Sequence, residues 1–248
     1  MNFADHNYLK NIDALTGLGN IPDAAIDLVL TDPPYNIADN NKLTKVGNKI
    51  VTTKKAWGEH YQDTWPDVES YYDWLKSYIT EFDRVLKEDG SMALFLDRKY
   101  TGLITYLIEK DFNLKFRNKL YFRKVNPLPH YLRNGYRSAI EECIWFTKGK
   151  QYTFNFGEQK DMIQVYDGPI GKKATKHPNE KYNWMIDPII RNHSNPGDVV
   201  LDAFAGSGSV LVRARKHERN AIGFEMNPEF YEMARNRCEQ EQLELTFD

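Results

Sequence analysis

The sequence predicts an α/β fold built on a doubly wound, mostly parallel sheet. Short apolar runs alternate along the chain with longer segments of helical period, which is typical of this class. A glycine-rich turn follows one of the runs, as at the ligand-binding edge of such a sheet. Acidic residues also follow the runs, so we expect five carboxylates to meet at this edge: Asp13, Asp32, Asp97, Asp202 and Glu225. With 248 residues, 41% of them hydrophobic, we expect residues 1–248 to form one domain.

Buried strands are predicted where apolar residues follow one another without interruption. Residues 26–30, 92–96, 199–201 and 221–224 are such runs, and residues 8–12 form a weaker one. Continuous apolar runs of this length are typical of parallel strands that are covered on both faces. We therefore expect a central sheet with helices on either side.

Helices are predicted where apolar residues recur at a spacing of three and four. Residues 71–86 show this spacing, with Gly90 as the stop signal, and residues 209–217 and 228–242 follow, the latter after Asn227 as an N-cap. Residues 37–66 and 151–176 lack a clear period and are predicted to be long loops. Long loops on a rigid sheet commonly carry function.

Composition excludes several classes of protein. No apolar run approaches the length needed to cross a membrane, and the first residues lack the basic start and apolar stretch of a secretory signal. Two cysteines, Cys143 and Cys238, fit a reducing compartment and cannot form a zinc site of paired cysteines. We expect a cytoplasmic protein without a metal.

Charge is segregated along the chain although the net charge is only −2. Residues 113–137 contain seven basic and no acidic side chains, interleaved with aromatic ones, and residues 40–57 contain five lysines and no acid. These runs are compatible with a solvated surface or with a face that contacts nucleic acid phosphates.

A glycine turn follows the run at residues 199–201. After Asp202 comes Ala-Phe-Ala-Gly-Ser-Gly-Ser, which lacks both the third glycine of the dinucleotide fingerprint and the closing lysine of a P-loop. Glu225 lies 23 positions later (225 − 202), at the end of the next strand, where a carboxylate can accept from both hydroxyls of a ribose. The pattern predicts a nucleoside ligand without phosphates.

A second unusual segment, Asp32-Pro33-Pro34-Tyr35-Asn36, follows the strand at residues 26–30. The two prolines fix the backbone and remove two amide donors, so the site offers only acceptors beside the Asp32 carboxylate. Acceptors suit an amino group with two N–H donors, and Tyr35 offers a ring on which a planar base could stack. An ordinary proline turn would look the same, but its occurrence together with the glycine turn and Glu225 favours the functional interpretation.

These two segments together resemble the S-adenosylmethionine-dependent amino-methyltransferases of DNA. The catalytic segment precedes the glycine segment, which is the motif order of the β class, and the resemblance implies a circularly permuted, Rossmann-like class I methyltransferase fold. Further matches are residues 13–15, 120–129, 141–144 and the His-Pro-x-x-Lys segment at 177–181. The recognition region usual between the last two matches is short here.

The resemblance also implies roles for individual residues. Catalysis would fall to Asp32, Pro33, Pro34 and Tyr35. The cofactor, S-adenosylmethionine, would be bound by Asp13, Ala14, His177, Lys181, Asp202, Phe204, Gly206, Ser207, Gly208, Glu225 and Asn227. Asp13 would accept from the adenine amino group of the cofactor, and His177 and Lys181 would lie near its carboxylate. Double-stranded DNA would be contacted by Asn36, Lys54, Lys55, Arg123, Lys124 and Asn126, with residues 37–66 and 151–176 as candidate recognition loops.

The reaction implied is methyl transfer to the N6 amino group of an adenine flipped out of duplex DNA. Cytosine N4 presents the same two donors and stays an alternative, although family usage favours adenine when the first motif residue is Asp. A DNA-binding protein that keeps the cofactor fold without turnover, and a dehydrogenase, are weaker alternatives. A second copy of the chain and a restriction endonuclease that acts on the same site are candidate partners.

Overall fold

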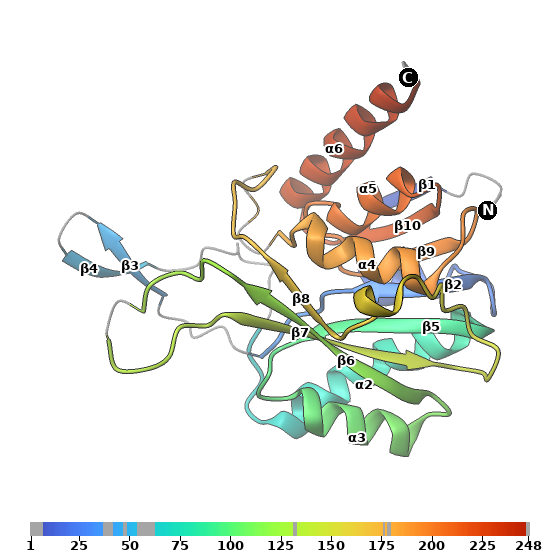
Figure 1. The fold of residues 1–248 in the computed structure, drawn as a ribbon, viewed down its shortest axis with the longest axis horizontal. Helices are drawn as coiled ribbons and strands as arrows, with labels where there is room; N and C mark the ends of the chain where they lie inside the picture. The colour runs from blue at the N-terminus through green and yellow to red at the C-terminus, as the bar shows by residue number, and fades with distance from the viewer. Residues whose placement is uncertain are drawn as a thin grey trace.

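The computed structural model describes residues 7–36, 42–46, 49–53, 63–130, 133–175, 177 and 180–246. Within these residues, the main sheet consists of β1 (Asn7–Asn11), β2 (Ile26–Thr31), β5 (Leu86–Leu96), β6 (Lys115–Lys124), β7 (Ile140–Thr147), β8 (Val165–Gly168), β9 (Val199–Asp202) and β10 (Asn220–Glu225). Their order is β1-β10-β9-β2-β5-β7-β6-β8 (Figure 1). The predicted doubly wound, mostly parallel sheet is confirmed.

The five strands from β1 to β5 in this order are parallel to one another, whereas β7 runs antiparallel to both β5 and β6. From β2 the chain proceeds outward to β5, and from β9 it proceeds outward in the opposite direction to β10. The boundary between β2 and β9 is therefore a topological switch point. In sheets of this kind, ligands bind in the crevice beyond the carboxyl ends of the strands at such a point.

Helices cover both faces of the sheet (Figure 1). Figure 1 shows α2 (Val68–Val85) and α3 (Thr101–Asp111) in one layer and α4 (Asn183–His193), α5 (Ser209–Lys216) and α6 (Pro228–Thr246) in the other. The short helix α1 (Ala14–Leu18) belongs to the layer of α2, because its buried residues share that core. Neighbouring residues of β2 serve the two layers in turn, because successive side chains of a strand point to opposite faces. Val29 belongs to the core beneath α2, while Leu28 and Leu30 pack with residues of α4 and α5.

Helix α2 forms for the reason that its spacing predicts, but its end differs from the prediction. Asp67 caps its N-terminus by accepting a hydrogen bond from the Ser70 amide at 2.7 Å, and the helix ends at Val85, where β5 follows at once. Gly90 is not a helix stop: it lies inside β5, where a Cβ would come within 2.9 Å of the Lys87 carbonyl oxygen. After the buried Leu86, residues 87–91 of β5 are polar or glycine, so the apolar run marked only the second half of the strand.

The two predicted loops contain secondary structure, and for these segments the prediction is wrong. Within residues 37–66, β3 (Lys42–Val46) pairs antiparallel with β4 (Lys49–Thr53), and Figure 1 shows this hairpin extending away from the main sheet. Within residues 151–176 lie the 3-10 turn η1 (Gln159–Asp161) and the edge strand β8. A four-residue strand exposed at a sheet edge has little apolar pattern for a sequence to reveal.

Helices α3 and α4 were not predicted from their period. Only Thr101, Ile104 and Ile108 of α3 are buried, so its apolar stripe is short, and Pro188 interrupts the pattern of α4. Among the residues that the structure describes, no helix combines the length and the apolar character needed to cross a membrane.

Candidate functional site

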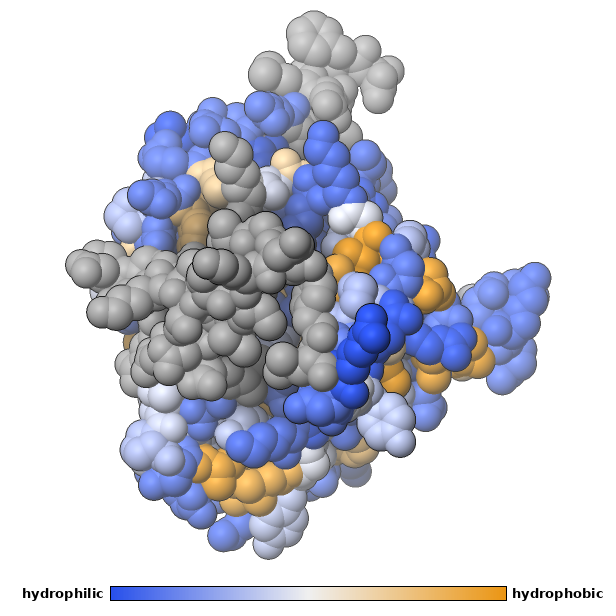
Figure 2. All heavy atoms as spheres, turned by 90° about the vertical axis from the view of Figure 1, so that its left-hand side faces the viewer, coloured by the Kyte–Doolittle hydropathy of each residue, from blue (hydrophilic) through white to orange (hydrophobic). Residues whose placement is uncertain are grey.

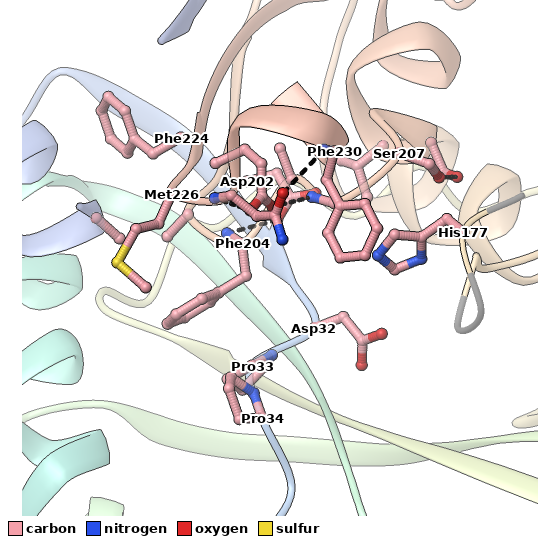
Figure 3. Close-up of a pocket in the computed structure, with 18 of the residues that line it drawn as sticks. Asp32, Pro33, Pro34, His177, Asp202, Phe204, Ser207, Phe224, Met226 and Phe230 are labelled. Atoms are coloured by element: carbon pink, nitrogen blue, oxygen red, sulfur yellow. Dashed lines mark hydrogen bonds between the residues drawn. The ribbon is translucent and has the colours of Figure 1, made fainter. Parts of the chain in front are cut away.

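A cavity of about 400 Å³ opens at the switch point between β2 and β9 (Figure 3). Residues after β1, β2, β9 and β10 line it together with side chains of α2 and of the segment before α4. Its size falls within the range of pockets that hold small organic ligands. Of the five carboxylates expected along this edge, Asp13, Asp32, Asp202 and Glu225 line the cavity. Asp97 does not: its carboxylate accepts from the Lys99 amide in the turn before α3.

The segment after β2 places Asp32 at the cavity. Pro33 and Pro34 are buried, and the Pro34 carbonyl accepts a hydrogen bond from the Tyr71 hydroxyl at 2.8 Å, which fixes the turn against α2. Figure 3 shows the Asp32 side chain directed into the cavity, away from the two proline rings. The Tyr35 hydroxyl donates to Asp32 Oδ1. The sequence prediction of rigid acceptors at this position therefore has a structural basis.

Lys181 supplies the cation that pairs with the Asp32 segment. Its ammonium lies 2.8 Å from Asp32 Oδ2, 2.9 Å from Glu141 Oε2 and 2.8 Å from the Tyr35 hydroxyl oxygen. Glu141 in turn pairs with Lys124 at 2.7 Å. The sequence placed Lys181 near the carboxylate of a cofactor, but in the structure its ammonium is engaged by two carboxylates of the protein.

Burial and ion pairing act in opposite directions on these groups. Burial raises the pKa of Asp32, and the Lys181 ammonium works against that rise. Burial also acts to raise the pKa of Glu141, but Lys181 and Lys124 outweigh it and bring that pKa to about 2. Lys181 has a raised pKa, because its two carboxylate partners outweigh the effect of burial. Glu141 and Lys181 are thus both charged at neutral pH.

Asp202 ends β9 on the opposite side of the switch point. Its Oδ1 accepts from the Thr31 hydroxyl of β2 at 2.6 Å and from the Phe204 amide at 3.2 Å. The first contact joins the strand that carries the Asp32 segment to the strand that carries the glycine turn. Burial raises the pKa of Asp202 to about 7.

The glycine turn leads from β9 into α5, as predicted. Gly206 and Gly208 have positive φ angles of 51° and 76°, a conformation that glycine adopts without strain. Space is limited as well, because a Cβ on Gly206 would lie 3.1 Å from Nε2 of His177. Ser207 contacts the hydroxyl of Ser209, and Arg237 of α6 approaches both serines. Gly206 therefore brings backbone to the cavity edge where a side chain would not fit, whereas Gly208, although expected to bind the cofactor, does not line the cavity and lies against Ala234 of α6.

Glu225 ends β10 beside this turn. Its two carboxylate oxygens accept from the Gly206 amide at 2.8 Å and from the Asn227 amide at 2.7 Å. Each oxygen keeps a second lone pair, so the carboxylate is oriented while retaining capacity to accept from a ligand. Burial raises its pKa. Asn227 caps α6 through its side-chain oxygen, which accepts from Glu229 at 2.8 Å, as the sequence predicted.

The remaining predicted cofactor residues also line the cavity. Asp13 caps α1 by accepting from the Thr16 amide at 3.1 Å, and Ala14 follows it. His177 packs edge-on against Phe230 with a centroid distance of 4.4 Å, and burial lowers its pKa to about 4. The imidazole is therefore neutral at pH 7.

Aromatic side chains form a wall that the sequence interpretation missed in part. Trp74 and Tyr78 of α2 line the cavity, and their rings lie 5.9 Å and 5.0 Å from that of Phe204. Both residues lie in the helix that the sequence predicts over residues 71–86, but no role at a ligand site was expected for either. Their spacing of four residues puts them on one side of a helix, which is the signal that could have revealed the wall.

Of the residues expected to contact DNA, several have internal partners. Lys124 pairs with Glu141, Arg123 pairs with Asp167 at the surface, and the Asn126 side chain exchanges hydrogen bonds with the backbone of Ile170. Asn36 has a positive φ of 58° and connects the Asp32 segment to the residues before α2. Its backbone amide donates to Asp63 at 2.6 Å, and its side-chain oxygen accepts from the Trp65 amide. Lys54 and Lys55 lie outside the described residues.

The loop between β6 and β7 reaches the same edge of the sheet as Asp32, because β7 begins beside the end of β5. Arg133 and Tyr136 are exposed there, and Tyr136 is fully so. Val125 and Leu128 are also more than half exposed. Among the residues that Figure 2 colours on the side of the β3–β4 hairpin, hydrophilic ones predominate, with hydrophobic ones between them.

Known protein families and individual proteins resemble this chain over most of its length. A family model described as DNA methylase matches residues 26–236. The curated protein "Type II methyltransferase M.HpaI" of Haemophilus parainfluenzae is 26% identical over 249 residues, which cover 92% of this chain and 73% of that protein. "Type II methyltransferase M.HinfI" of Haemophilus influenzae is 28% identical and is covered to 68%, against 94% of this chain.

Solved structures share the fold. The M1.HpyAVI-SAM complex superposes with a TM-score of 0.68 at 23% identity, covering 93% of this chain and 98% of that one. The PvuII DNA methyltransferase, described as cytosine-N4-specific, gives a TM-score of 0.74 at 18% identity, covering 94% of this chain and 89% of that one. The predicted class I methyltransferase fold is confirmed by these likenesses.

Proposed function

The chain belongs to the N6/N4 DNA methylase family, and from this premise we propose that it methylates the N6 amino group of adenine in duplex DNA. The observation that carries the proposal is the single cavity in which Asp32-Pro33-Pro34-Tyr35 faces the glycine turn after β9. A site of acceptors for an amino group and a site for a nucleoside cofactor are thereby adjacent. The cofactor is S-adenosylmethionine.

The residues of the cavity fit that cofactor. The oriented carboxylate of Glu225 suits the two ribose hydroxyls, and the wall of Trp74, Tyr78 and Phe204 suits a flat base and its apolar neighbours. The backbone of Gly206 can approach the ligand closely, and Gly208 shapes the turn that presents it. In addition to these, we propose Asp13, Ala14, His177, Ser207, Asp202 and Asn227 as cofactor-binding residues.

When bound, S-adenosylmethionine supplies a methyl group on a sulfonium that is already a good leaving group. The work of the protein is then to bind and orient the amine, whose lone pair is delocalised into the base. Asp32 accepts one N–H and the Pro33 carbonyl the other, which returns electron density to the nitrogen. Holding reactants in line in this way can contribute about 7–11 kcal/mol.

DNA is the substrate, and the target base lies inside a duplex before reaction. We propose that the base is flipped into the cavity, at a cost of a few kcal/mol that contact with Tyr35 helps to offset. Exposed basic residues at the same edge of the sheet, such as Arg133, contact phosphates. Residues 1–248 act as one domain, with residues 37–66 and 151–176 taking part in recognition.

Adenine is favoured over cytosine because the motif begins with Asp32, and the resemblance to adenine-specific members rests on that residue. The fold does not discriminate, since a cytosine-N4-specific enzyme superposes well. The alternative, cytosine N4, is therefore kept as the second candidate.

One experiment tests the proposal. The protein is incubated with duplex DNA and S-adenosylmethionine labelled in the methyl group, and the DNA is digested to nucleosides and separated. Label in N6-methyldeoxyadenosine is the expected result. Label in N4-methyldeoxycytidine would overturn the choice of base, and label in no nucleoside would overturn the function.

A further inference from the structure

The ion chain at Asp32 has a geometry that the proposed reaction alone does not require. Asp32 Oδ2, Lys181, Glu141 and Lys124 follow one another at 2.8, 2.9 and 2.7 Å, so two carboxylates and two ammonium groups alternate. Their formal charges cancel. Alternation of this kind is what permits several charges to share a buried site.

Lys181 is held from several sides. Its ammonium lies 5.2 Å from the ring centroid of Tyr35 and 5.0 Å from that of Phe95, in addition to its two carboxylate partners. Its side chain is only 10% exposed. A cation in this position interacts strongly with Asp32 because little water screens the pair.

Glu141 fixes the other side of the ammonium. It lies on β7, two positions before Cys143, whose side chain packs with Phe95 in the core on the α4 side of the sheet. Alternate residues of a strand share a face, so Glu141 points toward the same side. Its partner Lys124 comes from the end of β6, the strand that pairs with β7. Two adjacent strands thus anchor Lys181.

We propose that Lys181, anchored by Glu141, is a positioning residue that keeps the buried Asp32 carboxylate charged and turned into the cavity to accept the amino group. The inference rests on the proposed function. Without the cation, a buried carboxylate would favour its protonated form, which has lost part of its capacity as an acceptor. Lys181 thereby acts on the substrate through Asp32.

The proposal is tested by the pH dependence of turnover, kcat, in Lys181→Met and Lys181→Arg. Loss of the cation raises the pKa of Asp32, so the acidic limb of the profile moves upward by about one pH unit in Lys181→Met. Lys181→Arg keeps the charge and leaves the limb close to its original position. Affinity for S-adenosylmethionine, measured by calorimetry, changes less than threefold in both.

Glu141→Gln is the second variant, and Glu142→Gln is its matched control. Glu142 is the neighbouring glutamate of β7 and pairs with Lys119 and Thr101 instead. Glu141→Gln should lower kcat about tenfold by releasing Lys181, without moving the limb upward, because it removes a negative charge near Asp32. Equal kcat in the two glutamine variants would overturn the anchoring role.

Other titrating groups face Asp32, so the acidic limb of the pH profile must be assigned to a particular group. They are Tyr35, Glu141, Cys143, Lys181 and, across the switch point, Asp202. Carbon-13 NMR of labelled aspartate, assigned with Asp32→Asn, follows the Asp32 carboxyl directly and needs no turnover. An unchanged Asp32 titration in folded Lys181→Met would refute the inference, whereas an inactive wild-type protein would refute the proposed function.

Discussion

The two halves of the cavity hold buried carboxylates in different ways. On the glycine side, Asp202 and Glu225 accept from a hydroxyl and from backbone amides, and neither forms an ion pair within the described part of the chain. On the catalytic side, Asp32 shares Lys181 with Glu141, which does not itself line the cavity. The consequence is visible in two pKa values, about 7 for Asp202 and about 2 for Glu141.

The difference shows that the donor acts together with burial. At Glu141 the two ammonium groups outweigh burial, whereas at Asp32 burial still leaves the pKa raised against the opposing effect of Lys181. Neutral donors orient a carboxyl group and leave it able to accept from ribose hydroxyls. A hydroxyl can bind to the carboxyl group whether that group is charged or protonated. A buried ammonium opposes the effect of burial and favours the ionised carboxylate, which is the better acceptor for an amine. The halves therefore correspond to two tasks, binding the cofactor and activating the base.

The largest expected effect is on turnover in Asp32→Ala. Removing the acceptor should reduce methyl transfer by a thousandfold or more, on the order of 4 kcal/mol, while cofactor affinity stays within a few-fold. Transfer is measured with labelled cofactor and affinity by calorimetry. If turnover survives in Asp32→Ala, the catalytic half does not act through this carboxylate and the comparison fails.

Glu225→Ala should act on the other half. We expect cofactor affinity to fall by about ten- to a hundredfold, or roughly 1.4–2.8 kcal/mol, because the ribose acceptor is lost. Calorimetric titration with S-adenosylmethionine measures it, and Glu229→Ala, an exposed glutamate of the first turn of α6, is the control. Equal affinities in the two variants would remove Glu225 from the cofactor site.

Asp202→Asn tests how the buried Asp202 carboxyl group affects the pH dependence of the free energy of unfolding. In the folded protein the pKa of Asp202 is raised to about 7, so this group favours folding at low pH and stops doing so as pH rises. Between about pH 4 and pH 7, wild-type stability should fall relative to Asp202→Asn by up to about 1.4 kcal/mol per pH unit. Urea denaturation across this range measures the slope; the exposed variant Glu232→Gln should run parallel to wild type.

The parts of this site that were predictable from sequence are local ones. The Asp32 segment and the glycine turn are contiguous, and each follows an apolar run that the structure confirms as β2 or β9. Gly206 and Gly208 were informative because their residue type reports directly on backbone conformation. Glu225 was found by its distance along the chain from Asp202.

The partners of these segments were not predictable, because they come from distant parts of the chain. Glu141 meets Lys181 from 40 positions away (181 − 141), and Thr31 meets Asp202 across 171 positions. No local pattern marks Glu141 as different from Glu142, although they point to different partners. The basic run at residues 113–137 likewise reveals charge without showing which cations are already paired.

The smallest expected effect is on the salt dependence of DNA binding. It distinguishes cations that are paired within the catalytic half from cations that are exposed at its surface. Lys124 pairs with Glu141 and is 17% exposed, whereas Arg133 is exposed in the loop after β6. Arg133→Gln should reduce the slope of log K for DNA binding against log salt by up to about 0.9, the value for one phosphate contact. Lys124→Gln should leave the slope unchanged, because the ammonium of Lys124 is paired with Glu141 and does not contact phosphate. A slope that falls equally in both variants, measured by fluorescence anisotropy across a salt series, would mean that the ion chain itself opens onto the DNA.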